Sequence, residues 1–199
     1  MSVASFSKWG IRHRRSVILT TAARAIRRGG FQGVGVADIM KEAGLTHGGF
    51  YAHFSSRNAL LAEALERAGQ ESAARVDQAT AARRARGASA LRALVEGYLS
   101  DRHLGSIEAG CPVGALASEM PRQSPEVREA SAQRVRGLVA AVQRALPEDA
   151  PADSGPAIAS QLVGALQLAR ALGDNAEGQA LLRASRRALL AQYDRNPSD

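Results

Sequence analysis

Apolar residues recur along the chain at the three- and four-residue spacing of amphipathic helices, and no segment alternates apolar with polar residues over a useful length. Ala and Leu dominate the apolar residues, which favours helices over strands. The pattern therefore predicts an all-α protein of about nine helices. The expected helices are residues 9–28, 36–43, 46–54, 56–80, 88–104, 111–120, 124–146, 156–172 and 176–193.

Two of the short helices form a recognisable pair. Helices 36–43 and 46–54 are separated by a turn that contains Gly44, which is the layout of a helix-turn-helix. Ile39 on the first helix is expected to pack against Phe50 and Phe54 on the second. The helix at 9–28, which Gly29-Gly30 ends, completes a three-helix unit.

The second helix of this pair has an unusual outer face. Thr46 and Ser56 are the expected N-caps of this helix and of the next. Gly48 and Gly49 stand on the outer face, although each glycine in an exposed helix costs about 1 kcal/mol relative to Ala. Stability gives no reason for them, so we expect the backbone here to approach another surface closely.

Positive charge is concentrated at the N-terminal end of the chain. Residues 1–57 contain nine Lys or Arg and two acids, a net charge of +7, whereas the rest contains 17 of each kind. An excess confined to one end indicates a polyanionic partner there, with a solvated basic face as the alternative. The run Arg12-His13-Arg14-Arg15, preceded by Lys8 and Trp9, is interpreted either as a phosphate-following arm or as an ordinary solvated start of the helix.

Other classes of protein find little support. Cys111 is the only cysteine, so no internal disulfide can form, and no stretch approaches the roughly 18–20 apolar residues of a membrane span. The sequence GGFQGVG follows no strand and lacks the glycine order of a nucleotide loop. Neither metal-ligand spacing nor a catalytic triad stands out. We expect a cytoplasmic protein that is not an enzyme and has no cofactor, no metal and no membrane partner.

The segment VADIMKEAGLTHGGFYAHFSSRNALLAEAL resembles the DNA-binding signature of the TetR family of bacterial transcriptional repressors. The resemblance covers about residues 14–64, and many positions agree in order without gaps. It implies an N-terminal helix-turn-helix domain, residues 1–57, and a C-terminal helical domain for effector binding and dimerisation, residues 58–199. The segment GCPVGALASEM also resembles part of one subset of the family, more weakly.

The resemblance assigns the recognition helix to residues 46–52, which would enter the major groove. Thr46 and Tyr51 would contact phosphates, while His47 and the two glycines would approach base edges. The residues that it implies for DNA binding are Thr46, His47, Gly48, Gly49, Tyr51, His53, Arg57 and Arg14.

The chain departs from the family pattern in the first helix of the pair. Val34-Gly35 stands where a Thr/Ser pair usually supplies an N-cap and a phosphate contact. Asp38, an acid in the first turn, partly compensates for the missing cap. Met40 replaces a small Ala, so the helix packing must differ slightly.

The larger part of the chain is expected to hold an effector and a partner subunit. A pocket among the helices at 58–80, 88–104, 111–120 and 124–146 would suit a small, mostly apolar or electrophilic effector. Its expected lining is Leu94, Tyr98, Leu99, Cys111, Leu116, Met120 and Leu138. The last two helices are expected to form a two-fold four-helix bundle. The interface residues expected there are Ile158, Leu162, Ala165, Leu166, Ala169, Leu181, Ser185, Ala188 and Leu189.

Cys111 has two interpretations: a thiol at a helix start that senses electrophiles, as in some TetR-like regulators, or a small buried hydrophobe. For the whole chain, the favoured hypothesis is a dimeric repressor that binds a palindromic double-stranded DNA operator and is released by a small molecule. The alternative is a basic helical protein that binds nucleic acid or anionic membrane without sequence specificity.

Overall fold

The computed structural model describes residues 3–194 of the chain, with side chains described from residue 10 onward, and these residues contain helices and no strand. The N-terminal elements are α1 (Val3–Gly29), α2 (Val36–Glu42), the short 3-10 helix η1 (His47–Ala52) and the long α3 (Arg57–Arg84). They are followed by α4 (Ala90–Tyr98), α5 (Asp101–Gly105), α6 (Pro112–Leu116) and η2 (Met120–Arg122). The chain ends with α7 (Pro125–Ala145), α8 (Ser154–Leu172) and α9 (Ala176–Tyr193).

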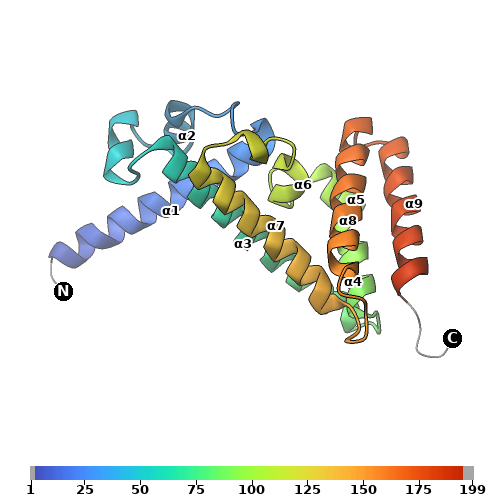
Figure 1. The fold of residues 1–199 in the computed structure, drawn as a ribbon. Coiled ribbons are helices and arrows are strands. Elements are labelled where there is room, and N and C mark those ends of the chain that lie inside the picture. The colour runs from blue at the N-terminus through green and yellow to red at the C-terminus, as the bar shows by residue number, and fades with distance from the viewer. Residues whose placement is uncertain (1–2, 195–199) are drawn as a thin grey trace.

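The elements form two ends joined by two long helices (Figure 1). α2 and η1 lie at one end, and α8 and α9 lie side by side at the other. α3 and α7 pack along each other between the two ends. α4 and α5 lie beside the α8–α9 pair. α3 packs against α1 at one end and against α4 at the other, so a movement of α3 would affect both ends.

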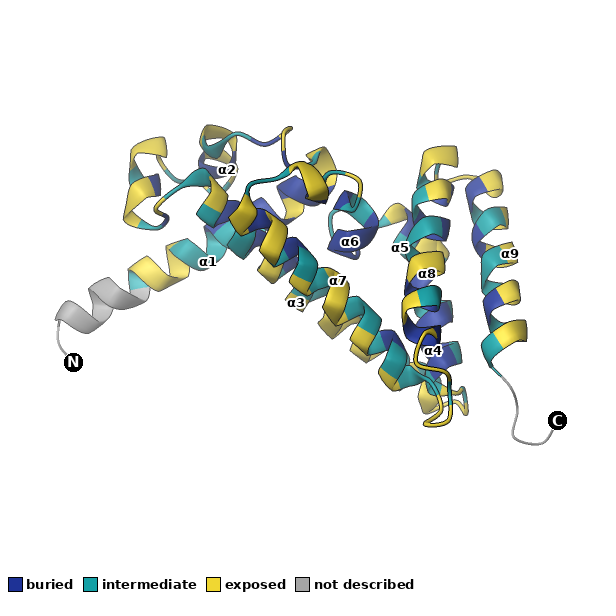
Figure 2. Cartoon of the chain, in the orientation of Figure 1, coloured by how far each residue is buried: buried dark blue, intermediate teal, exposed yellow. Residues whose placement is uncertain are grey.

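One continuous hydrophobic core joins the two ends. It begins with Phe31 and Phe50 beneath the helix-turn-helix, passes Leu65 on α3, and reaches Leu166 and Leu189 on the last two helices. Figure 2 shows buried residues where α1 meets α3 and also on α4, α6 and α8. The expected division at residues 57 and 58 falls at the start of α3, whose first turns pack against α1.

The all-α prediction is confirmed, and the differences lie in how the predicted helices are divided. The segment expected as one helix over 88–104 is two, because Ser100 accepts a hydrogen bond from the backbone N–H of His103 at 3.2 Å and begins α5. The segment 111–120 likewise divides into α6 and η2. Apolar spacing alone does not reveal an N-cap inside a helical pattern, because the apolar residues before and after the cap keep the same spacing.

The first helix is longer than predicted. α1 begins at Val3 and not near residue 9, so the run Arg12-His13-Arg14-Arg15 lies well inside the helix and not at its start. The side chains of Lys8 and Trp9, which were grouped with this run, lie outside the described side chains. Arg12 and Arg14 are exposed on α1.

Candidate nucleic-acid interface

The turn between α2 and η1 depends on Gly44. Its φ of 72° is in the left-handed region, which residues other than glycine adopt only at an energetic cost. The turn closes with a hydrogen bond from the Leu45 N–H to the Met40 carbonyl at 2.8 Å. The chain can therefore reverse within a few residues and place η1 across α2.

Two phenylalanines fix η1 on the core. Phe50 is 1% exposed and Phe54 is 3% exposed, and their rings stack with centroids 5.7 Å apart. The guanidinium of Arg15 lies 4.8 Å from the Phe54 ring centroid and pairs with Glu63 at 2.6 Å. Arg15 also donates to the His53 carbonyl, so the end of η1 is held to α1 and α3.

The opposite face of η1 is open to solvent. Tyr51 is 74% exposed, and Thr46, His47 and Gly48 are also exposed. Thr46 occupies the N-cap position, but its hydroxyl makes no capping hydrogen bond and is available to a ligand. Gly49 and His53 are half-buried at the edge of this face.

Arg57 is directed toward the protein interior rather than toward this face. Its guanidinium donates to the carbonyl of Phe31 and to the carbonyl of Val34, the latter at 3.2 Å. The side chain thus ties the loop before α2 to the start of α3. The sequence indicates a cation here but does not show which acceptor it reaches.

The helix-turn-helix is tied to the rest of the chain by three further contacts that the sequence did not reveal. Arg27, buried in α1, donates to Glu71 at 2.8 Å and to the Gly110 carbonyl at 3.2 Å. Burial lowers the pKa of Arg27, and the Glu71 carboxylate offsets this.

The other two residues that make such contacts are Arg28, in the last turn of α1, and Glu119, which follows α6. Arg28 pairs with Glu42 and with Glu108, both at 3.0 Å. The Glu119 carboxylate accepts a hydrogen bond from the Phe31 N–H at 2.9 Å. The segments around residues 108–110 and 119 therefore contact the helix-turn-helix end directly.

The residues expected to line an effector pocket lie together in the core. Leu99 has no exposed surface, and the others, apart from the half-buried Leu138, are at most 6% exposed; they are Leu94, Tyr98, Cys111, Leu116 and Met120. Burial raises the pKa of the Tyr98 hydroxyl, which lies beside Cys111.

Most residues expected at the dimer interface pack inside the subunit. Five of them are 0–1% exposed, namely Ile158, Leu162, Leu166, Ala169 and Leu189, and Ala165 is 8% exposed. Leu181 and Ser185 are half-buried and Ala188 is exposed. The large apolar side chains that α8 leaves outside are Leu168, 61% exposed, and Leu172, 38% exposed. Both faces of α8 are apolar, so helical spacing could not tell which one meets the core.

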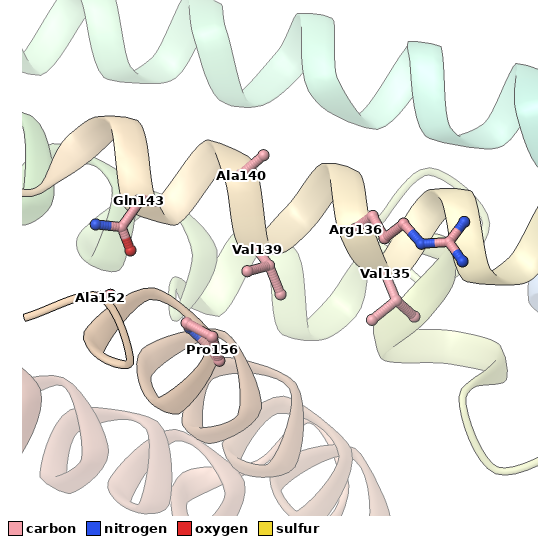
Figure 3. A pocket seen from close by; sticks show the side chains of 7 residues that line it. All are labelled: Val135, Arg136, Val139, Ala140, Gln143, Ala152 and Pro156. Carbon is pink, nitrogen blue, oxygen red and sulfur yellow. The ribbon is translucent and has the colours of Figure 1, made fainter.

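Two hollows open on the surface formed by residues 72–156. One, about 510 Å³, lies between α7 and the start of α8 (Figure 3). It is lined by Val135, Arg136, Val139, Ala140, Gln143, Ala152 and Pro156. The other, about 660 Å³, lies between the second half of α3 and the segment 97–110. Within the described residues, no three His, Cys, Asp or Glu side chains are placed to hold a metal ion, and no helix is long and apolar enough to span a membrane.

Comparisons with known proteins agree with this geometry. Residues 18–64 match the family model of bacterial regulatory proteins of the tetR family, and residues 87–185 match that of the tetracyclin repressor-like C-terminal domain. An uncharacterized HTH-type transcriptional regulator of Mycobacterium tuberculosis is 29% identical over 189 residues, which are 89% of this chain and 95% of the relative.

Solved structures show the same fold. A TetR transcriptional regulator from Chloroflexus aurantiacus has a TM-score of 0.73 at 19% identity, over 92% of this chain and 97% of that one. The reduced form of E. coli NemR has a TM-score of 0.71 at 21% identity, over 89% and 95% of the two chains. Family identity points to a regulator rather than an enzyme. With both of its domains matched and its helix-turn-helix in place, the chain belongs to the TetR family of HTH transcriptional regulators.

Proposed function

We propose that the protein is a dimeric repressor that binds a palindromic operator and releases it when a small molecule binds. The observation that carries the proposal is the face of η1: Phe50 and Phe54 are buried beneath it, while Tyr51 and Thr46 are exposed on it. The net charge of +7 confined to residues 1–57 gives this end the sign that a polyanion requires. A DNA-bound regulator works where the DNA is, so the cytoplasm is its proposed location.

Each exposed residue of η1 has a proposed role. The hydroxyls of Thr46 and Tyr51 bind phosphates and set the register of the protein on the duplex. The His47 imidazole donates to a purine acceptor, while Gly48 keeps the backbone close to the groove. Arg14 and His53 contact the sugar-phosphate backbone at the edges, and Arg57 holds the loop at 31–34 in place.

Dimerisation is proposed to occur through α8 and α9. Leu168 and Leu172 are exposed on α8, and Gly164 lies on the same helix with open space where a side chain would be. A leucine pair beside a small residue allows another helix to pack closely. Two subunits would then present two recognition elements to half-sites about 34–36 Å apart.

Release requires an effector that binds more tightly to the subunit arrangement that cannot hold DNA. The elements available for transmission are α3 and the ties from Glu119 and Gly110 to the DNA-binding end. Sensing of electrophiles by Cys111 stays a prediction: the thiol is 6% exposed, so an electrophile would reach it only after local opening. Release by electrophiles that persists in Cys111→Ser would remove that role.

The test uses Tyr51→Phe, which removes one hydroxyl from an exposed ring. Operator affinity is expected to fall by about tenfold because each subunit loses a phosphate hydrogen bond. Affinity for unrelated DNA should fall in proportion, since phosphate contacts do not read sequence. The measurement is fluorescence anisotropy with a palindrome from the DNA flanking the gene and with a scrambled duplex. Tyr193→Phe, at the end of α9, is the control and should bind as the unmodified protein does.

Two results would contradict the proposal. Unchanged operator affinity in Tyr51→Phe would remove η1 from the interface. Equal affinity for the palindrome and the scrambled duplex would favour non-specific binding, which the family identity does not favour. A specific complex instead exceeds the non-specific one by about a thousandfold or more.

A further inference from the structure

The larger hollow lies between the second half of α3 and the segment from Gly97 to Gly110, and its volume is about 660 Å³. That volume is within the range of small-molecule sites. We propose that this groove binds an organic anion, a carboxylate or phosphate carried on an apolar body, and that this anion is the effector. The effector role rests on the proposed function, whereas binding to the groove does not.

Four arginines determine the charge of the groove. Arg75, Arg83 and Arg86 come from α3 or its end and Arg102 comes from α5, while no Asp or Glu is among the residues that line it. Arg83 also pairs with Glu96, which lies outside the lining, at 3.8 Å. Like charges that share a concave surface repel each other, so an anion placed among them is attracted.

Two of these arginines have guanidinium groups that bind no other described group. Within the described side chains, Arg86 and Arg102 make no hydrogen bond or ion pair, and both are exposed. Charge-assisted hydrogen bonds from guanidinium to carboxylate or phosphate are among the stronger polar contacts in proteins. These two side chains can supply them without giving up a contact that holds the fold.

Part of the groove is apolar and suits the apolar body of a ligand. Val76, Ala79 and Ala82 line it from α3, and Gly97 lines it from α4. Burial of alkyl carbons against such a surface contributes roughly 0.8 kcal/mol for each methylene group. Because basic and apolar side chains line the same groove, it favours an amphipathic anion over an inorganic one.

One wall of the groove is tied to the DNA-binding end. Arg75 donates to the Ala109 carbonyl, and the next carbonyl, that of Gly110, accepts from Arg27 of α1 at 3.2 Å. Glu108, which precedes Ala109 in the chain but does not line the groove, pairs with Arg28 at 3.0 Å. An anion that draws Arg75 away from Ala109 would therefore act on a segment already bonded to α1.

The binding test compares three probes of equal chain length on the full-length protein: octanoate, octyl phosphate and 1-octanol. Isothermal titration is expected to show both anions binding at least about tenfold more tightly than the alcohol. Arg86→Gln combined with Arg102→Gln should weaken the anions by about tenfold or more and leave the alcohol unchanged. Arg84→Gln, an exposed neighbour on α3 outside the groove, is the matched control and should bind both anions as the unmodified protein does.

The outcomes separate the groove from the function. Anion binding that is absent, matched by the alcohol or retained in the double variant would overturn the groove as an anion site. Octanoate is also expected to lower operator occupancy, and less so in the double variant. If the anions bind the groove but do not change occupancy of a specific operator, the effector assignment fails and the anion site stands. If no specific operator binding exists, the proposed function fails independently of the calorimetry.

Discussion

At the scale of single residues, the fold strongly alters the pKa of His103. Its Nδ1–H donates to the Tyr98 carbonyl at 2.7 Å, and its Nε2 accepts from the Cys111 N–H at 3.0 Å. A neutral imidazole ring therefore uses both of its nitrogens in hydrogen bonds. Burial is the main cause that lowers the pKa of His103 from 6.5 to about 4; the hydrogen bond to the Tyr98 carbonyl opposes this shift, and the nearby Arg170 contributes to it.

The lowered pKa of His103 predicts that the folded protein loses stability in mild acid. Between pH 6.5 and 4 the unfolded chain takes up a proton that folded His103 does not, so the stability present above pH 6.5 is lost as the pH falls. The full loss corresponds to about 3 kcal/mol. Urea unfolding at pH 7, 5.5 and 4.5 measures it. The His103→Gln variant should show a flatter pH dependence, whereas His47→Gln, on the exposed face, should keep it; equal slopes in all three proteins would contradict the prediction.

At the scale of elements, η1 is a 3-10 helix where an α-helix was expected. Its six residues include two glycines, which stabilise helices poorly, so the element depends on packing of Phe50 rather than on its own propensity. An added Cβ at Gly48 would meet nothing within 4 Å. The fold therefore gives no steric reason for glycine at this position.

Gly48→Ala is expected to separate stability from DNA binding. The free energy of unfolding should stay the same or rise by up to about 1 kcal/mol, because alanine is the better helix former. Operator affinity should fall by about tenfold, since the methyl group stands between the backbone and the DNA groove.

The matched control is Gly137→Ala on α7, which is also exposed with open space around it. It should gain the same stability without losing operator affinity. If Gly48→Ala bound the operator as well as Gly137→Ala did, the close approach of η1 to DNA would be excluded. Chemical denaturation and anisotropy on the same preparations give both quantities.

At the scale of the whole molecule, we propose that the two ends of the subunit contact different partners. The basic excess lies at the helix-turn-helix end, while exposed leucines lie on α8 at the opposite end. Contact between two copies through α8 and α9 would leave both DNA-binding ends free. This arrangement predicts that operator binding and dimerisation are lost together.

Leu168→Glu is expected to yield a folded monomer. The side chain is 61% exposed, so a carboxylate there costs the subunit little, but it would be buried without a partner in the dimer. Sedimentation should show half the mass, and operator affinity should fall by about a hundredfold or more. Ile107→Glu, at a residue 44% exposed outside the α8–α9 face, is the control. A Leu168→Glu protein that stays dimeric would exclude this face as the interface.

The sequence by itself determined the local features of this protein. Helical spacing located the helices, Gly44 marked the turn, and the inward positions of Phe50 and Phe54 followed from spacing within one short segment. The exposed face of η1 was predictable for the same reason, because residues three or four apart share a face whatever they pack against. The family signature depends on the same local pattern.

Tertiary structure alone decided which partners distant side chains reach. Long side chains can extend in several directions, and only the fold set Arg57 against loop carbonyls and Glu119 against Phe31. It also placed most of the expected interface residues of α8 in the core of the subunit. Apolar spacing along a helix shows that a face is buried, but not whether it packs against the same subunit or a partner. The basic groove is the clearest case. Residues 58–199 carry as many acids as bases, yet folding gathers four arginines around one hollow and leaves their acidic neighbours outside it.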